Sequence, residues 1–255
     1  MTTTGRTGVL EERTTADPTV PRAELADWPA RFGLRAGITL RGQGFSLGLW
    51  SDESAGSVLT RWRAFQEASR PGFERFVLGH QVHGVEIAWH GPGGDGWLIC
   101  EGVDGHATGE AGVLLCVTVA DCVPIYVCHP PSRHHALLHA GWRGVASGIL
   151  ERAITSLHER VGAAPADLVI HLGVAICGDC YEVGPEVVHS VTRRPARGPE
   201  RLDLRAALAD RAAALGVGEV TMSPWCSAHD EAFYSHRRSR GADGRMVAYV
   251  GRPAA

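Results

Sequence analysis

The chain has 255 residues, 44% hydrophobic content and a net charge of −3, which is typical of a soluble globular protein and offers no basic surface for nucleic acid or an anionic membrane. All 25 basic residues are arginine, so chemistry that requires a lysine nucleophile, a pyridoxal phosphate lysine or a P-loop lysine is excluded. Seven cysteines, no apolar run of roughly 18 residues and no signal peptide predict a reducing, cytoplasmic compartment.

Residues 1–27 are rich in Thr, Arg, Glu and Pro and are predicted to be a flexible tail, whereas residues 28–255 are predicted to form a single catalytic domain. Hydrophobic periodicity indicates the elements of this domain, and Asp203 is the expected N-cap of its last helix. In chain order we predict a helix over Ser57–Ala68, strands over Phe76–Leu78, Val85–Trp89, Val113–Val119, Ile125–Cys128 and Ala136–His139, a helix over Val145–Val161, a strand over Leu168–Ile176, helices over Pro185–Val191 and Leu204–Leu215, and strands over Val220–Met222, Ala232–Ser235 and Met246–Val250.

The order of these elements predicts the fold class. Helices and strands interleave, but several strands follow one another without a helix long enough for a crossover connection. We therefore predict an α+β domain with mixed sheets rather than a doubly wound fold.

Three short segments flanked by Gly or Pro each offer one soft metal ligand, namely His83, Cys122 and His139. Two imidazoles and a thiolate are enough to hold Zn²⁺ or copper and still leave a coordination position open, as in catalytic zinc sites. Taken singly, a His is more often a surface or hydrogen-bonded residue and a Cys a small buried apolar group. The residue types alone leave both interpretations open.

Asp121 precedes Cys122, and on a regular strand their side chains would face opposite ways. Both can address one site only if the chain turns there, which the nearby Pro124 favours. Asp121 then acts in the site or orients a His ligand.

Two other pairs of residues suggest different chemistry. Cys122 with His139 fits the nucleophile and base of a Cys hydrolase, with His83 as a third group or a bystander. Cys177 and Cys180 have the spacing of a redox or zinc-knuckle pair, but no second pair is evident in the sequence.

Several arginines are candidates for binding an anion. Arg143 lies in a Gly-flanked turn just before a predicted helix, where a phosphate or carboxylate is favoured. Arg237 and Arg238 form a second cationic pair, with a solvated surface or a salt bridge as the alternative. Tyr181 is a further candidate for substrate contact, with a packing role as the alternative.

Four ordered motifs carry a family resemblance. Gln81–Gly84, Ala120–Pro124, His139–Gly144 and Cys180–Gly184 resemble the YfiH-like family, long labelled multicopper polyphenol oxidase or laccase-domain proteins and now regarded as zinc-dependent purine nucleoside phosphorylases with adenosine deaminase activity. The match runs from about Gly37 to Val250. It also includes Asp104, Asp203-Leu204, Cys226, Phe233–Arg238 and Gly244–Met246.

The resemblance implies an α+β sandwich of mixed β-sheets with flanking helices, related to bacterial toxin Cys-His hydrolases. It implies that His83, Cys122 and His139 bind the metal and that Asp121 is the neighbouring catalytic carboxylate. Zn²⁺ is the expected cofactor, with copper as the alternative.

The expected reaction is phosphorolysis of adenosine, inosine or methylthioadenosine to free base and ribose 1-phosphate, with deamination of adenosine at the same site. Asp121, Cys122 and Arg143 are the expected catalytic residues. Arg143, Arg237, Arg238 and Tyr181 are expected to bind substrate or phosphate. The expected partners are purine nucleoside and phosphate, with no nucleic acid or membrane, and the expected assembly is a monomer.

The chain departs from the family pattern at three places. Gly48 stands where the family usually has Asn, His236 stands where it has Tyr, and the stretch Gly173–Tyr181 lacks both usual prolines. The metal positions are unaffected, so these changes bear on substrate preference.

Three alternative functions remain. A copper-dependent polyphenol oxidase needs many His ligands, often as His-x-His, and the chain has no such pair. A Cys-His hydrolase that edits peptidoglycan precursors is the second alternative. A binding module without catalytic activity is the third.

Overall fold

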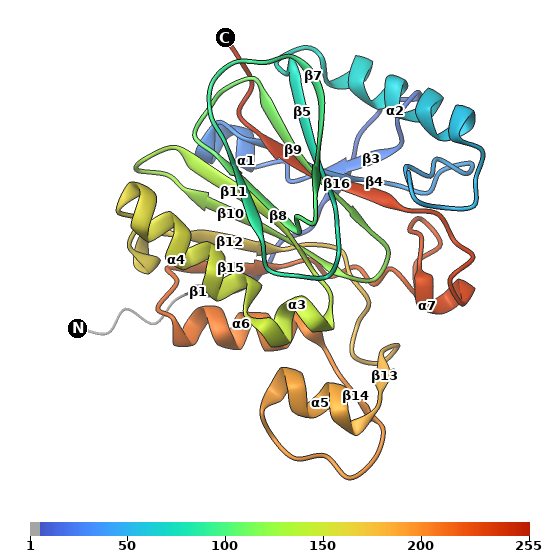
Figure 1. The fold of residues 1–255 in the computed structure, drawn as a ribbon, viewed down its shortest axis with the longest axis vertical. Helices are drawn as coiled ribbons and strands as arrows, with labels where there is room; N and C mark the ends of the chain where they lie inside the picture. The colour runs from blue at the N-terminus through green and yellow to red at the C-terminus, as the bar shows by residue number, and fades with distance from the viewer. Residues whose placement is uncertain (1–5) are drawn as a thin grey trace.

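The computed structural model describes residues 6–255, which fold around two large mixed sheets (Figure 1). Sheet A contains seven strands in the order β1 (Arg6–Val9), β15 (Glu219–Met222), β12 (Val169–Leu172), β10 (Val123–His129), β11 (His134–Ala140), β8 (Gly105–Thr108) and β6 (Ile87–His90). Sheet B contains seven in the order β2 (Arg13–Thr14), β3 (Arg22–Glu24), β4 (Arg35–Thr39), β16 (Met246–Gly251), β9 (Val113–Val119), β5 (Arg75–His80) and β7 (Gly96–Glu101).

Both sheets contain parallel and antiparallel neighbours. In sheet A, β10 is antiparallel to β11 and to β12, whereas β12 is parallel to β15. In sheet B, β16 is antiparallel to β4 and β9, whereas β5 is parallel to β7 and β9. A small separate sheet pairs β13 (Glu182–Val183) with β14 (Glu200–Arg201). The predicted mixed-sheet α+β class is confirmed.

The sheets face each other, and helices cover their outer faces (Figure 1). The outer face of sheet B packs against α2, and that of sheet A packs against α3, α4 and α6, with α5 against α3 and α6. The helices are α1 (Trp28–Phe32), α2 (Ala55–Ser69), α3 (Trp142–Ser147), α4 (Ile149–Val161), the 3₁₀ turn η1 (Pro165–Asp167), α5 (Pro185–Thr192), α6 (Leu204–Ala214) and α7 (His236–Ser239).

Strand β10 shows why the central strands consist of continuous runs of apolar residues. Its Ile125 and Val127 belong to the core beneath the helices, whereas Tyr126 and Cys128 belong to the core between the sheets. Because successive side chains of a strand point to opposite faces, a strand in a middle layer needs apolar residues at every position.

Most predicted elements are present, and the run Val113–Val119 has the predicted bounds. Asp203 caps α6 as expected, because its carboxylate accepts hydrogen bonds from the backbone N–H groups of Arg205 and Ala206.

Three predicted elements are corrected. The single helix over Val145–Val161 is two helices, because Gly148 adopts the left-handed conformation, with φ of 86°, between α3 and α4. The predicted strand Ala232–Ser235 is a loop whose last residue caps α7. The strand predicted over Leu168–Ile176 stops at Leu172.

The predicted flexible tail is wrong for residues 6–27, and residues 1–5 lie outside the described part of the chain. Strand β1 pairs with β15 in sheet A, whereas β2 and β3 extend sheet B. Glu12, Val20 and Leu25 are buried. This segment is mostly polar, so its few buried apolar residues form no clear hydrophobic pattern in the sequence.

Candidate active site and metal centre

The three predicted metal ligands come together where the two sheets meet. The donor atoms of His83, Cys122 and His139 all lie within 4.8 Å of one another. His83 follows β5 of sheet B, Cys122 lies in the turn from β9 to β10, and His139 is near the end of β11 in sheet A. The site therefore joins both halves of the sandwich.

Asp104 positions two of these three residues, His83 and His139. Its fully buried carboxylate accepts backbone hydrogen bonds from Val82, His83 and Gly84 at 3.0, 2.9 and 2.7 Å, which shapes the turn in which His83 has a φ of 60°. The same carboxylate lies 2.9 Å from Nδ1 of His139. With Nδ1 bonded to Asp104, Nε2 of His139 is the nitrogen left for a metal.

Asp104 is ionised in this arrangement. Burial alone raises its pKa, but the hydrogen bonds from His139 and from the backbone of Gly84 and Val82 outweigh burial and hold the pKa below its usual value. A buried carboxylate that accepts an imidazole N–H increases the basicity of that ring as a metal ligand.

Cys122 and His139 form a charge-coupled pair. Burial raises the pKa of the Cys122 thiol, but the charge and hydrogen bonds of His139 and His83 lower it to about 6. Burial lowers the pKa of His139, but the Cys122 thiolate and Asp104 raise it to about 9. The Cys122 Sγ lies 3.9 Å from Nε2 of His83. A thiolate is the form of Cys that binds metals and attacks electrophiles.

Gly141 leaves room for this cluster. A Cβ atom there would lie 2.8 Å from Cδ2 of His83 and 3.0 Å from Sγ of Cys122. Only a glycine lets the backbone between β11 and α3 approach the ligands so closely.

Asp121 lies in the turn that the sequence predicted. Its φ of 85° breaks strand alternation, so that its side chain and that of Cys122 border the same cavity. Its carboxylate accepts hydrogen bonds from Oγ of Ser227 at 2.6 Å and from the backbone N–H of Arg237 at 2.7 Å. Orientation of a His ligand, the alternative role for Asp121, belongs instead to Asp104.

A cavity of about 510 Å³ opens beside the three candidate metal ligands. Arg143, Tyr181 and Arg237 border it, with the guanidinium of Arg237 5.1 Å from the centroid of the Tyr181 ring. Trp50 stacks on His80 with ring centroids 4.6 Å apart, which places a flat aromatic surface at the border of the same cavity. A volume of this size suits a small-molecule ligand.

Arg238 is directed away from the cavity, unlike Arg143 and Arg237. Its guanidinium donates to the backbone carbonyls of Asp230 and Phe233 and pairs with Asp243 at 3.6 Å. Arg238 therefore braces the loop before α7 and is not among the residues that border the cavity.

Several residues in or beside the cavity were not predicted from the sequence or had no role assigned to them. Asp104 stood in the family match without a function, and Ser227 had no signal apart from its neighbour Cys226. Gly48 and His236, both departures from the family pattern, border the cavity together with Arg245.

Comparison with known proteins gives the family. A profile described as multi-copper polyphenol oxidoreductase laccase matches residues 35–253. A protein of Geobacillus stearothermophilus named purine nucleoside phosphorylase YlmD is 35% identical, over 92% of this chain and 98% of its own length. A Deinococcus radiodurans protein named purine nucleoside phosphorylase is 33% identical, over 88% and 89% of the two chains. A protein from an unknown prokaryotic organism named adenosine deaminase RL5 is 36% identical over 57% of this chain and 60% of its own.

Solved structures give the same fold. The crystal structure of YlmD from Geobacillus stearothermophilus matches with a TM-score of 0.87 at 32% identity, covering 95% of this chain and all of the other. The structure of the Bacillus licheniformis hypothetical protein YfiH matches with a TM-score of 0.84 at 24% identity, over 93% and 98% of the two chains. This chain therefore belongs to the multi-copper polyphenol oxidoreductase laccase family, the YfiH-like proteins.

Proposed function

We propose that this chain is a purine nucleoside phosphorylase that also deaminates adenosine at the same site. The observation that carries the proposal is the cluster of His83, Cys122 and His139 beside a cavity bordered by Arg143 and Arg237. The names of the relatives supply the substrate class.

The donor set fits Zn²⁺, which takes imidazole and thiolate ligands, and three protein ligands leave an open position. When bound, the metal would supply Lewis acidity and lower the pKa of water to about 7. Copper fits the same donors, since Cu²⁺ binds such sites more tightly than Zn²⁺ does.

For phosphorolysis, Arg143 and Arg237 bind phosphate and hold it against the anomeric carbon of the ribose. An oxygen of hydrogen phosphate forms a bond to C1′ while the glycosidic bond breaks. The electron pair of the broken bond leaves with the base, and the proton that the phosphate loses ends on the base. The two guanidinium groups lie in the border of the cavity, so they need little reorganisation to position the anion. Tyr181 supports Arg237 through its ring face.

For deamination, water adds at C6 of adenosine and ammonia leaves. Asp121 takes a proton from the water and passes it to the departing nitrogen. Ser227 and the backbone N–H of Arg237 fix the carboxylate for this transfer.

The surroundings of the reaction follow from the same proposal. The partners are purine nucleoside and phosphate, and the protein acts as a monomer. A reducing cytoplasm keeps the seven cysteines free. Among residues 6–255, no helix combines the length and apolar character needed to cross a membrane.

Product analysis with inosine tests the proposal. Zinc-loaded protein should release hypoxanthine and ribose 1-phosphate only when phosphate is present, and Cys122→Ala should abolish this reaction and adenosine deamination. Cys128→Ala is the matched control, because Cys128 is buried in the core between the sheets and outside every metal-ligand group. Retained activity in metal-free Cys122→Ala would contradict the assignment.

A second candidate, a Cys-His hydrolase, is favoured by the chain of hydrogen-bonding groups from Cys122 through His139 to Asp104. In this reading Asp104, rather than His83, is the orienting third group. Alkylation separates the two candidates. A nucleophilic Cys122 is labelled with or without chelator, whereas a metal-bound thiolate is protected until the metal is removed.

A multicopper phenol oxidase is not supported by the described residues. Each group of His and Cys close enough to bind a metal within residues 6–255 contains at most two His. A cluster of several copper ions requires more imidazole ligands in one place.

A further inference from the structure

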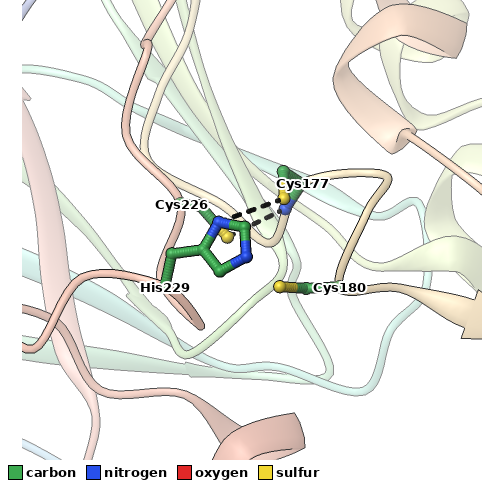
Figure 2. Close-up of side chains that lie close together, drawn as sticks. All are labelled: Cys177, Cys180, Cys226 and His229. Atoms are coloured by element: carbon green, nitrogen blue, oxygen red, sulfur yellow. Dashed lines mark hydrogen bonds between the residues drawn. The ribbon is translucent and has the colours of Figure 1, made fainter.

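A second cluster of side chains that could hold a metal ion consists of Cys177, Cys180, Cys226 and His229 (Figure 2). Cys177 and Cys180 belong to the loop that follows β12, and Cys226 and His229 belong to the loop that follows β15. The four donor atoms lie within 4.8 Å of one another, with Sγ of Cys177 3.8 Å from Nδ1 of His229. None of these residues borders the cavity.

The second half of this cluster, Cys226 and His229, was not predicted from the sequence. Cys177 and Cys180 have the spacing of a zinc-binding pair, and Cys226 with His229 repeats that spacing. The two halves are 49 residues apart at their first members and meet because β12 and β15 are parallel neighbours in sheet A. Two such pairs in contact make a closed four-ligand set.

The geometry suits tetrahedral zinc. Four ligands at the Zn–S distance of about 2.3 Å place neighbouring sulfurs about 3.8 Å apart, so the present separations need only a small contraction. The backbone N–H of Cys177 donates to Sγ of Cys226 at 3.3 Å, a bond that supports a thiolate. All three cysteines are free of disulfides, which leaves their sulfurs available.

A third group, His90, Cys100 and His106, is not a closed set of four ligands. Nε2 of His90 lies 3.0 Å from Nδ1 of His106, so the two imidazoles use those nitrogens on each other.

The Cys₃His cluster joins the loop after β12, which contributes Ile176 and Tyr181 to the border of the cavity, to the loop after β15, which carries Ser227. Ser227, which donates to Asp121, follows Cys226, and its backbone N–H donates to Ala175 at 3.1 Å. Tyr181 follows Cys180 and carries Arg237 on its ring face. Fixing the cluster fixes Ser227 and Tyr181 together.

We propose that Cys177, Cys180, Cys226 and His229 bind a structural zinc ion that clamps these two loops. This ion is separate from the one proposed at His83, Cys122 and His139. Because all four ligands come from the protein, no position is open for water or substrate, and the ion stabilises the fold without taking part in the reaction.

Metal counting tests the clamp without reference to activity. Untagged protein from zinc-supplemented cells should contain two equivalents of zinc per chain, Cys122→Ala one, His229→Ala one, and the double variant none. His229 is exposed, so His229→Ala should fold even if Cys180→Ser does not. Cys128→Ala should keep both equivalents.

Cobalt identifies the ligands. Co²⁺-loaded Cys122→Ala should show the visible bands of a tetrahedral thiolate site, and these bands should disappear in Cys122→Ala combined with Cys180→Ser. Cys180→Ser alone should also lower Tm but should keep the zinc held by His83, Cys122 and His139.

Two results would overturn the clamp. One is an unchanged zinc content in both His229→Ala and Cys180→Ser. The other is a disulfide among Cys177, Cys180 and Cys226 in the freshly isolated protein, detected by mass spectrometry after alkylation without reductant. Neither result depends on whether the protein is a phosphorylase, so failure of the clamp and failure of the proposed function are distinguishable.

Discussion

Asp104 positions two of the three candidate metal ligands. One carboxylate holds the backbone of the His83 turn and the ring of His139, so two ligands from different sheets share one buried anchor. An ionised group in this position is stable only because every lone pair it uses meets an N–H donor.

Replacing Asp104 with Asn keeps the shape but places an NH₂ group where acceptors are required. We expect the affinity for zinc to fall about 10–100-fold, the usual cost of losing such a supporting group. Competition with a chromophoric chelator measures this change. Asp95→Asn in an exposed loop is the control, and an equal affinity in the Asp104 and Asp95 variants would contradict the role of Asp104.

Gly141 tests whether the close backbone approach is necessary. In Gly141→Ala the new methyl group must displace His83 or Cys122, an overpacking cost of about 1–3 kcal/mol, so metal affinity should fall by about 5–150-fold. The φ of Gly141 is −76°, so backbone strain does not contribute. Gly198→Ala, where no heavy atom lies within 4 Å of the added Cβ, should bind zinc like the parent.

At the scale of the elements, the central strands bury polar side chains along with apolar ones. His135 in β11 is fully buried, and neither of its ring nitrogens has a hydrogen-bond partner in the described part of the chain. Burial, with a smaller effect from the charge of Arg252, lowers its pKa to about 3.

This burial predicts a pH dependence of stability. The unfolded chain, with the ordinary His pKa of about 6.5, takes up a proton before the folded chain does. The contribution of His135 is therefore complete above about pH 6.5 and is lost as pH falls from there towards 3. Urea unfolding at several pH values should show a shallower loss of stability below pH 6.5 in His135→Leu than in the parent. His189→Leu, at an exposed position on α5, should keep the parent slope.

Some elements could be predicted from the local sequence pattern and others could not. The run Val113–Val119 could be predicted because its residues are apolar on both faces, as a middle layer requires. The break at Gly148 could not, because the apolar spacing of α4 continues across it and only the fold places that glycine at φ 86°. Ala232–Ser235 has the composition of a strand but is a loop whose last residue, Ser235, caps α7.

At the scale of the whole molecule, residues 6–27 tie the two sheets together. Strand β1 lies in sheet A and β3 in sheet B, and buried Glu12 lies between them in sequence. Its carboxylate accepts a hydrogen bond from Oγ of Ser223 at 2.6 Å and lies 3.1 Å from Nε2 of His171.

Removing this anchor should destabilise the whole fold. In Glu12→Ala the buried groups of Ser223 and His171 lose their partner, which costs about 1–3 kcal/mol of the free energy of unfolding. Glu12→Gln, which keeps an acceptor, should lose less. Denaturant unfolding measures both, with the exposed Glu11→Ala as control. Equal stability of Glu12→Ala and Glu11→Ala would show that the segment is not an anchor.

Sequence by itself determined the fold class and most central elements, because these depend on local periodicity, and its contiguous family motifs pointed to His83, Cys122 and His139 as candidate ligands. Tertiary structure decided which side chains meet. Asp104 reaches His139, Ser227 reaches Asp121, and Cys226 with His229 completes the pair at Cys177 and Cys180. Such contacts join residues tens of positions apart, and only the register of the strands that carry them brings them within bonding distance.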